Sequence, residues 1–330
     1  MCRGLQFIHG LASNPEIFRT HGSDLLSCFD LVASRSRNPA VRSLARSLGK
    51  ERALQWRRDR PLLPKDANAD QISDFVQGTD AADRLGVRDR SLKPIIKQAA
   101  AQFPVTDYLW FDPRIEPPPN DVPEECRCGL WNDRGSKSCR KCKRRLTMIN
   151  RYWIWYFALT RTSIGESYGV RLGSSYRQVI RWISTMRPYS GSEDDANPDF
   201  YDLLYATTHV VYTLNDYNRY RLSRRWLPRE FRFLKESVRE AIAQHDVEML
   251  GEILDSLKAF GMGNGNPLLK VGIDYFLKHQ NRDGSWGEPT KDSYQTYHTT
   301  WTVVDGLRDY AWQGLAPVSS RIMKSLKLSQ

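Results

Sequence analysis

The sequence predicts an all-α protein that is built from helical-hairpin repeats. Two observations lead to this fold class. The first is a pattern that occurs twice without gaps, at Tyr205–Asp216 and Tyr294–Asp305, and reads Tyr-x-Thr-x-His-x-x-aromatic-Thr-aliphatic-x-Asp. The second is a series of helix-length segments in the second half of the chain, two of which begin with a proline in the first turn, at Pro228 and Pro267. Repeats of this length come from stacked or ring-arranged units that bury a face against the next unit.

The residues that recur in the repeat share one face of a helix. The Tyr, His, aromatic and Asp positions follow the 3.6-residue helical period, and a fainter third copy at Tyr152–Thr160 carries Tyr156 where the others carry His. The remaining positions are largely apolar. A polar stripe on such a helix is typical of a helix that lines a wet cavity.

Length and composition indicate a globular protein with a large core. The chain has 330 residues, 10 Trp and 15 Tyr, and its net charge of +11 comes mostly from the first half. No apolar segment at the start of the chain reads as a signal peptide. The longest aromatic and apolar run, Tyr152–Leu159, is far below the ~20 residues that a membrane span requires. We therefore expect a cytoplasmic protein with no membrane span.

The first part of the chain reads as short helices that end at a proline-rich linker. We expect an N-terminal helical region over 1–111, a linker and cysteine motif over 112–145, and a helical-repeat domain over 146–330. In the first region, residues 61–75 read as a connection. The helices expected there are Leu5–Leu11, Ser23–Ser34, Val41–Trp56 and Ile95–Phe103.

Four cysteines in two close pairs follow the linker. Cys126 and Cys128 are separated by one residue, and Cys139 and Cys142 by two. In a chain without signs of secretion this spacing favours a four-thiolate zinc site over disulfides. Four thiolates leave no open position on the metal, so the zinc is expected to be structural.

Basic residues surround the cysteines. The cluster holds phosphates and hence nucleic acid, or it offsets the negative charge of a thiolate zinc site; the sequence leaves both readings open. Asp133 is the one acidic residue in the segment. The cations are Arg127, Arg134, Lys137, Arg140, Lys141, Lys143, Arg144 and Arg145.

The repeat domain alternates inner and outer helices. A loop at 188–198 has the composition of a disordered segment. Inner helices are expected at 148–163, 200–222, 247–260 and 294–310, and outer ones at 174–186, 228–244 and 267–279.

Two motifs in this domain resemble a known superfamily. Gln280–Gly287 reads Gln-Asn-Arg-Asp-Gly-Ser-Trp-Gly, which is similar to the repeat motif of squalene–hopene and oxidosqualene cyclases, and Tyr297-His298-Thr299 with Asp305-Gly-Leu307 resembles a segment of protein prenyltransferase β subunits. The resemblance implies an α/α toroid in which Gln280 and Trp286 tie an outer helix to the next inner helix. It also implies that His298 is a metal ligand. The chain has no cysteine after Cys142 and no Asp-x-Asp-Asp sequence, so neither family's catalytic set is complete.

The repeat supplies the candidate site. We expect His209, His298, Asp216 and Asp305 to be catalytic, and a second metal is expected at the two histidines, completed by Glu248, Glu252 or Asp255. The alternative is that these side chains form interhelical hydrogen bonds that fix the packing. The expected substrate-binding residues are Trp153, Tyr156, Tyr205, Tyr212, Tyr294 and Trp301.

Three functions follow from these features. The first is a cyclase- or transferase-like metalloenzyme that acts on an apolar or isoprenoid-like small molecule. The second is a nucleic-acid- or phosphate-binding protein that uses the basic zinc motif. The third is a helical-repeat protein that binds another protein without catalysis.

Overall fold

The computed structural model describes residues 1–189 and 200–327, and in these residues it contains 15 helices and no sheet. The expected all-α fold class is confirmed. The expected disordered loop at 188–198 falls almost entirely outside the described residues. None of the helices in the described part has the length and apolar character needed to cross a membrane.

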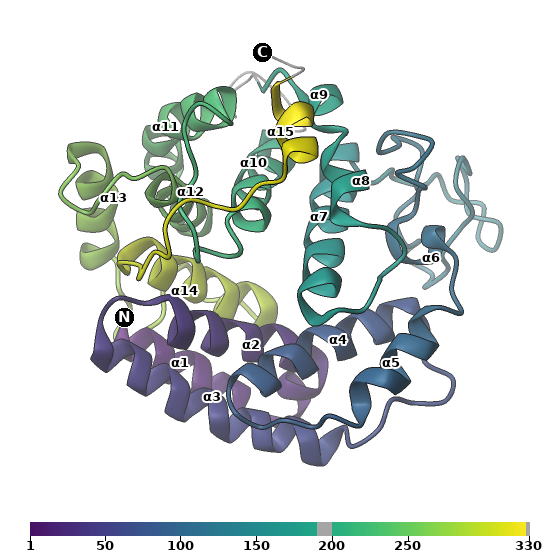
Figure 1. Ribbon diagram of the computed structural model, residues 1–330, viewed down its shortest axis with the longest axis horizontal. Coiled ribbons are helices and arrows are strands. Elements are labelled where there is room, and N and C mark those ends of the chain that lie inside the picture. The colour runs from purple at the N-terminus through teal and green to yellow at the C-terminus, as the bar shows by residue number, and fades with distance from the viewer. Residues whose placement is uncertain (190–199, 328–330) are drawn as a thin grey trace.

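Six helices form an inner ring. Each contacts the next in the order α2 (Pro15–Arg35), α4 (Ala69–Arg84), α7 (Arg151–Tyr168), α10 (Phe200–Leu214), α12 (Val247–Ala259) and α14 (Ser293–Leu307), and α14 contacts α2 again (Figure 1). The chain therefore forms a closed α/α toroid.

The outer layer alternates with the inner ring along the chain. Each outer helix packs against the inner helix that precedes or follows it. The outer helices are α1 (Cys2–Ala12), α3 (Pro39–Asp59), α5 (Leu92–Ala100), α8 (Tyr176–Ile180), α11 (Pro228–Ala243) and α13 (Pro267–Lys278). Three further short helices are α6 (Val105–Leu109), α9 (Ile183–Met186) and α15 (Ser320–Lys327).

Local sequence signals set the starts of several helices. Asn14, Asn38 and Asn266 each precede a proline and accept hydrogen bonds from backbone N–H groups of the first turn of α2, α3 and α13. The asparagine oxygen satisfies donors that have no partner inside the helix, and the proline costs no hydrogen bond there.

The first and last parts of the chain meet where the ring closes. Arg308, just after α14, donates to the backbone oxygen of Leu31 at 3.0 Å and to the hydroxyl of Ser36 at 3.2 Å. The backbone N–H of Ala311 donates to Arg35 at 2.8 Å. Helices from the expected N-terminal region and from the expected repeat domain thus share one ring.

The loop with the sequence Asp-Gly-Ser-Trp joins the outer helix α13 to the inner helix α14. The indole N–H of Trp286 donates to the backbone oxygen of Phe276 on α13 at 2.8 Å, and its backbone N–H donates to Thr300 on α14 at 3.3 Å. Trp286 therefore ties the two helices together as expected. The amide of Gln280 instead stays within the loop, where it donates to Gly284 at 2.9 Å.

Three expected elements need correction. The helix expected at 174–186 is divided into the short helices α8 and α9. The expected connection at 61–75 overlaps α4, an inner helix that begins at Ala69 and was not expected from the sequence. The expected helix at 200–222 ends at Leu214. The reason is that Asp216, Tyr217 and Asn218 all have left-handed backbones, with φ of 53°, 48° and 65°.

Candidate functional site

The six inner helices line a cavity of about 350 Å³. Every inner helix contributes side chains to its wall, so the cavity is the lumen of the ring. All four expected catalytic residues line it: His209, Asp216, His298 and Asp305. Both copies of the repeat therefore turn their polar stripe toward the lumen.

Aromatic rings form a second part of the wall. Tyr156, Tyr212, Tyr294 and Trp301 line the cavity as expected, and Phe157 joins them. The other two expected substrate-binding residues do not line it. Trp153 stacks on Phe157, with ring centroids 5.0 Å apart, and Tyr205 directs its hydroxyl to Glu248 at 2.8 Å.

A glycine allows α12 to approach α14 closely. A Cβ atom at Gly251 would lie 2.6 Å from the backbone carbonyl carbon of Thr302, which is nearer than a real Cβ atom comes to another atom. Glycine removes this clash. The close approach brings Glu248 and Glu252 of α12 within reach of His298 on α14.

His298 and Glu248 form a buried ion pair, with 3.0 Å between Nδ1 and Oε1. Glu248 also accepts hydrogen bonds from Tyr205 at 2.8 Å, Gln295 at 2.5 Å and Thr299 at 3.0 Å. Burial alone would raise the pKa of Glu248, but these hydrogen bonds and the charge of His298 lower it to about 2. Burial alone would lower the pKa of His298, but Glu248 raises it to about 9. Both groups are charged at neutral pH.

His209, the repeat equivalent of His298, has the opposite protonation state. Its Nδ1 donates to the backbone oxygen of Tyr205 at 2.8 Å. Burial lowers the pKa of His209 to about 4, and the nearby charge of His298 contributes to this. The neutral imidazole keeps a lone pair on Nε2, because Nδ1 carries the proton. Its ring lies against Tyr156, with centroids 4.7 Å apart.

Glu252 lies one helical turn after Glu248 and lines the lumen. It is fully buried, and burial raises its pKa to about 8 in spite of the charge of His298 and a hydrogen bond from the hydroxyl of Thr208. Glu252 is therefore a neutral carboxylic acid at pH 7. Two glutamates one turn apart thus differ by about six pKa units, since Glu248 has a pKa of about 2.

The two aspartates of the repeat, Asp305 and Asp216, differ in their burial and in their ion-pair partners. Burial raises the pKa of Asp305 to about 7, although Arg308 lies 2.7 Å from its carboxylate. Asp216 is more exposed and lies 3.5 Å from Arg35 and 3.3 Å from Arg219.

The backbone around Asp216 adopts an unusual conformation. Three consecutive left-handed residues follow Asn215, whose side chain accepts a hydrogen bond from the backbone of Asn218 at 2.8 Å. Asn218 in turn donates to Asp255 at 2.7 Å. Such conformations persist where the surroundings enforce them, as they often do at functional sites. Here the turn places Tyr217 and Asn218 in the lumen wall.

The sequence did not reveal that the first helices contribute to the site. Asp24 and Asp30 on α2 and Asp80 and Arg84 on α4 line the same cavity. Burial raises the pKa of Asp30 to about 6, although Arg84 lies 3.5 Å away. The sequence does contain one signal for the start of α4, which is the capping box formed by Asn68 and Gln71. Nothing in the sequence placed these carboxylates opposite the histidines.

The expected second metal site has no matching ligand cluster. In residues 1–189 and 200–327, the four cysteines are the one group of three or more His, Cys, Asp or Glu side chains whose ligand atoms lie within 4.8 Å of one another. Neither His209 nor His298 belongs to such a group of three or more. Each histidine uses Nδ1 for another partner.

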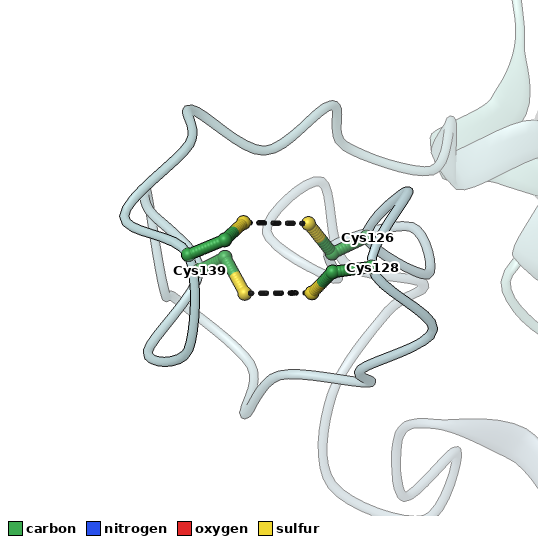
Figure 2. A group of neighbouring side chains, drawn as sticks. Cys126, Cys128 and Cys139 are labelled. Atoms are coloured by element: carbon green, nitrogen blue, oxygen red, sulfur yellow. Dashed lines mark hydrogen bonds between the residues drawn. The ribbon is translucent and has the colours of Figure 1, made fainter.

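The four cysteines do form a cluster that fits a metal ion. Figure 2 shows Cys126 and Cys128 on one loop facing Cys139 on another. The sulfur atoms of Cys126 and Cys142 lie 3.5 Å apart, and those of Cys128 and Cys139 lie 3.6 Å apart. A tetrahedral zinc ion with Zn–S bonds of ~2.3 Å separates its sulfurs by about 3.8 Å. The donors therefore suit a tetrahedral thiolate site.

Comparisons of the chain with protein-family models, curated proteins and solved structures give no significant match.

Proposed function

We propose that the protein is an enzyme that performs acid-catalysed chemistry on a small molecule in the lumen of the toroid. The observation that carries the proposal is the pair formed by a neutral Glu252 and a positively charged His298 in a single cavity. A general acid is most effective when its pKa lies near the working pH, and the pKa of Glu252 is about 8. Environments that push the pKa values of neighbouring groups apart are typical of active sites.

Glu252 is the proton donor in this proposal. Its proton passes to the substrate and leaves a buried carboxylate. The imidazolium of His298 stabilises that carboxylate, since its charge already favours the ionised form of Glu252. Glu248 holds His298 in its charged form through the 3.0 Å ion pair. His209 is neutral, in contrast to His298. It accepts a hydrogen bond from the substrate or takes up the proton that the product releases.

The aromatic part of the lining favours an apolar, isoprenoid-like substrate. Protonation of an alkene or an epoxide produces positive charge on carbon, and the faces of Tyr156, Tyr294 and Trp301 stabilise such charge in the cavity. The resemblance of Gln280–Gly287 to the cyclase motif points to the same substrate class. Metal chemistry is not required for this step.

The test uses isoprenoid alkenes and their epoxides as probes. The full chain is incubated in D₂O with squalene and farnesol, whose products are examined by mass spectrometry for one added deuterium on carbon. It is also incubated with their epoxides, whose opening is followed as loss of the epoxide. We expect the wild-type protein to give a deuterated product from an alkene or to open an epoxide, and Glu252→Gln to lose this turnover by about 100-fold or more. The control is His279→Ala, an exposed histidine on the outer face, which should keep full turnover.

Two results would contradict the proposal. One is that the wild-type protein converts none of the probes. The other is that Glu252→Gln forms product at the rate of the His279→Ala control.

For the cysteine cluster we propose a structural zinc ion. Cys126, Cys128, Cys139 and Cys142 would hold it, and four thiolates leave no position for substrate or water.

A further inference from the structure

The cysteine module, defined as residues 121–149, carries more positive charge than a zinc site needs. The module contains eight Lys and Arg residues and four acidic residues, Asp121, Glu124, Glu125 and Asp133. A zinc ion with four thiolates has a charge of −2, which two cations offset. After the four acidic residues are also set against four cations, an excess of two positive charges remains. Charge compensation alone does not account for this segment.

Most of these cations are exposed and unpaired with acids. Within the described residues, Arg134 pairs with Glu116 and Asp121, and Arg140 lies 3.9 Å from Asp133. The other six have no ion pair in that part of the chain and are exposed to solvent: Arg127, Lys137, Lys141, Lys143, Arg144 and Arg145.

A rigid scaffold holds these side chains. The backbone N–H of Cys139 donates to Arg144 at 2.8 Å and that of Leu146 donates to Lys137 at 3.1 Å, which forms a tight hairpin around the second cysteine pair. Cys126, Cys139 and Leu146 form a small core separate from the main core of the ring. The module lies at the periphery of the toroid, between α6 and α7 in the chain (Figure 1).

An exposed aromatic ring accompanies the charges. The side chain of Trp131 lies in the same module and is 50% exposed, which is unusual for so large an apolar group. Aromatic rings beside cations are the combination with which proteins bind single-stranded nucleic acids, because bases stack on the ring while phosphates contact the cations.

We propose that the cysteine module binds single-stranded nucleic acid. The phosphates contact Lys137, Lys141 and Arg144 with their neighbours, and a base stacks on Trp131. Both the number of unpaired cations and the exposed indole favour this partner over an acidic peptide, which offers no flat ring for stacking. The function is separate from the lumen chemistry and depends on different residues.

The experiment measures binding of fluorescently labelled oligouridylate and oligothymidylate to the full chain by anisotropy over a series of salt concentrations. For single strands, each neutralised phosphate contributes about −0.7 to the slope of log K against log salt. The triple variant Lys137→Gln, Lys141→Gln, Arg144→Gln should therefore flatten the slope by about 2. Trp131→Ala should weaken binding roughly 5- to 100-fold with little change of slope, and Trp131→Phe should restore most of it.

The matched control removes three exposed cations from the outer helix α3, through Arg46→Gln, Lys50→Gln and Arg58→Gln. This variant should keep both the affinity and the slope of the wild-type protein. Three outcomes would overturn the proposal: no binding by the wild-type protein, equal loss in the α3 control, or equal binding of heparin together with no effect of Trp131→Ala. The last result would show a surface for polyanions in general. Zinc content and the melting temperature of each variant confirm that the module is still folded.

Discussion

At the scale of single residues, the two histidines of the repeat differ because their partners differ. His298 faces the carboxylate of Glu248, which raises its pKa to about 9. His209 donates to a backbone oxygen of Tyr205, which adds no charge, and burial lowers its pKa to about 4. The same side chain at the same place in the repeat is thus a cation in one copy and a neutral imidazole in the other.

Removing the carboxylate of the ion pair should destabilise the protein. Glu248→Gln leaves His298 without its counterion in a buried site, and we expect the free energy of unfolding to fall by about 3 kcal/mol at pH 7. Urea unfolding measures this change. Glu236→Gln, an exposed glutamate on α11, is the control and should change stability by less than about 0.5 kcal/mol.

The effect should depend on pH in a defined direction. The pKa of His298 rises from 6.5 to about 9 on folding, so its contribution is fully present below pH 6.5 and is lost as the pH rises through 9. The difference between wild type and Glu248→Gln should shrink over this interval. An equal difference at pH 6 and pH 10 would contradict the ion pair.

The sequence identified part of this residue-level site. The repeat pointed to His209 and His298, and Glu248 and Glu252 were expected nearby as carboxylates that complete a metal site. Their protonation states could not be predicted, because the pKa values depend on burial and on partners from other helices. The lumen carboxylates Asp24, Asp30 and Asp80 come from distant parts of the chain and carry no local signal.

At the scale of helices, periodicity and capping predicted most of the second half. The helices expected at 228–244, 247–260, 267–279 and 294–310 correspond to α11, α12, α13 and α14 within a few residues. The predicted end of α10 was wrong because Asn215 and Asn218 are joined by side-chain hydrogen bonds in a turn that a helical period does not reveal. The inner helix α4 was not expected, because the residues before it contain prolines and aspartates that are typical of a connection.

A bound metal ion would hold the cysteine module in place, so loss of the metal should loosen this module. We expect metal analysis of the purified full chain to find one zinc ion per chain and Cys139→Ser to lose it. Hydrogen exchange should then quicken in residues 121–149, because their small core is separate from the main one. Amides in α12 and α14 should exchange at the wild-type rate.

The variant Cys28→Ser provides the comparison, since this buried thiol lies outside the cysteine cluster. It should retain the zinc ion. A wild-type protein without bound metal, or unchanged exchange in 121–149 after Cys139→Ser, would rule out a structural metal site there.

At the scale of the whole molecule, both ends of the chain build the lumen. α14 packs against α1 and α2, and Arg308 joins this seam to Leu31 and Ser36. The repeat in the sequence predicted only the part of the ring from α7 to α14. The closing helices α2 and α4 lack the repeat pattern, so their place in the ring follows from packing and not from sequence similarity.

Burial in the lumen wall keeps Glu252 protonated, so the protonation of Glu252 tests the central claim most directly. Infrared difference spectra between wild type and Glu252→Gln, recorded from pH 4 to pH 10, isolate the C=O band of its carboxylic acid. We expect the band to be present at pH 7 and to disappear with a midpoint near pH 8. A midpoint near the ordinary value of 4.5 would show an ionised Glu252 at neutral pH and would contradict an acid-catalytic lumen.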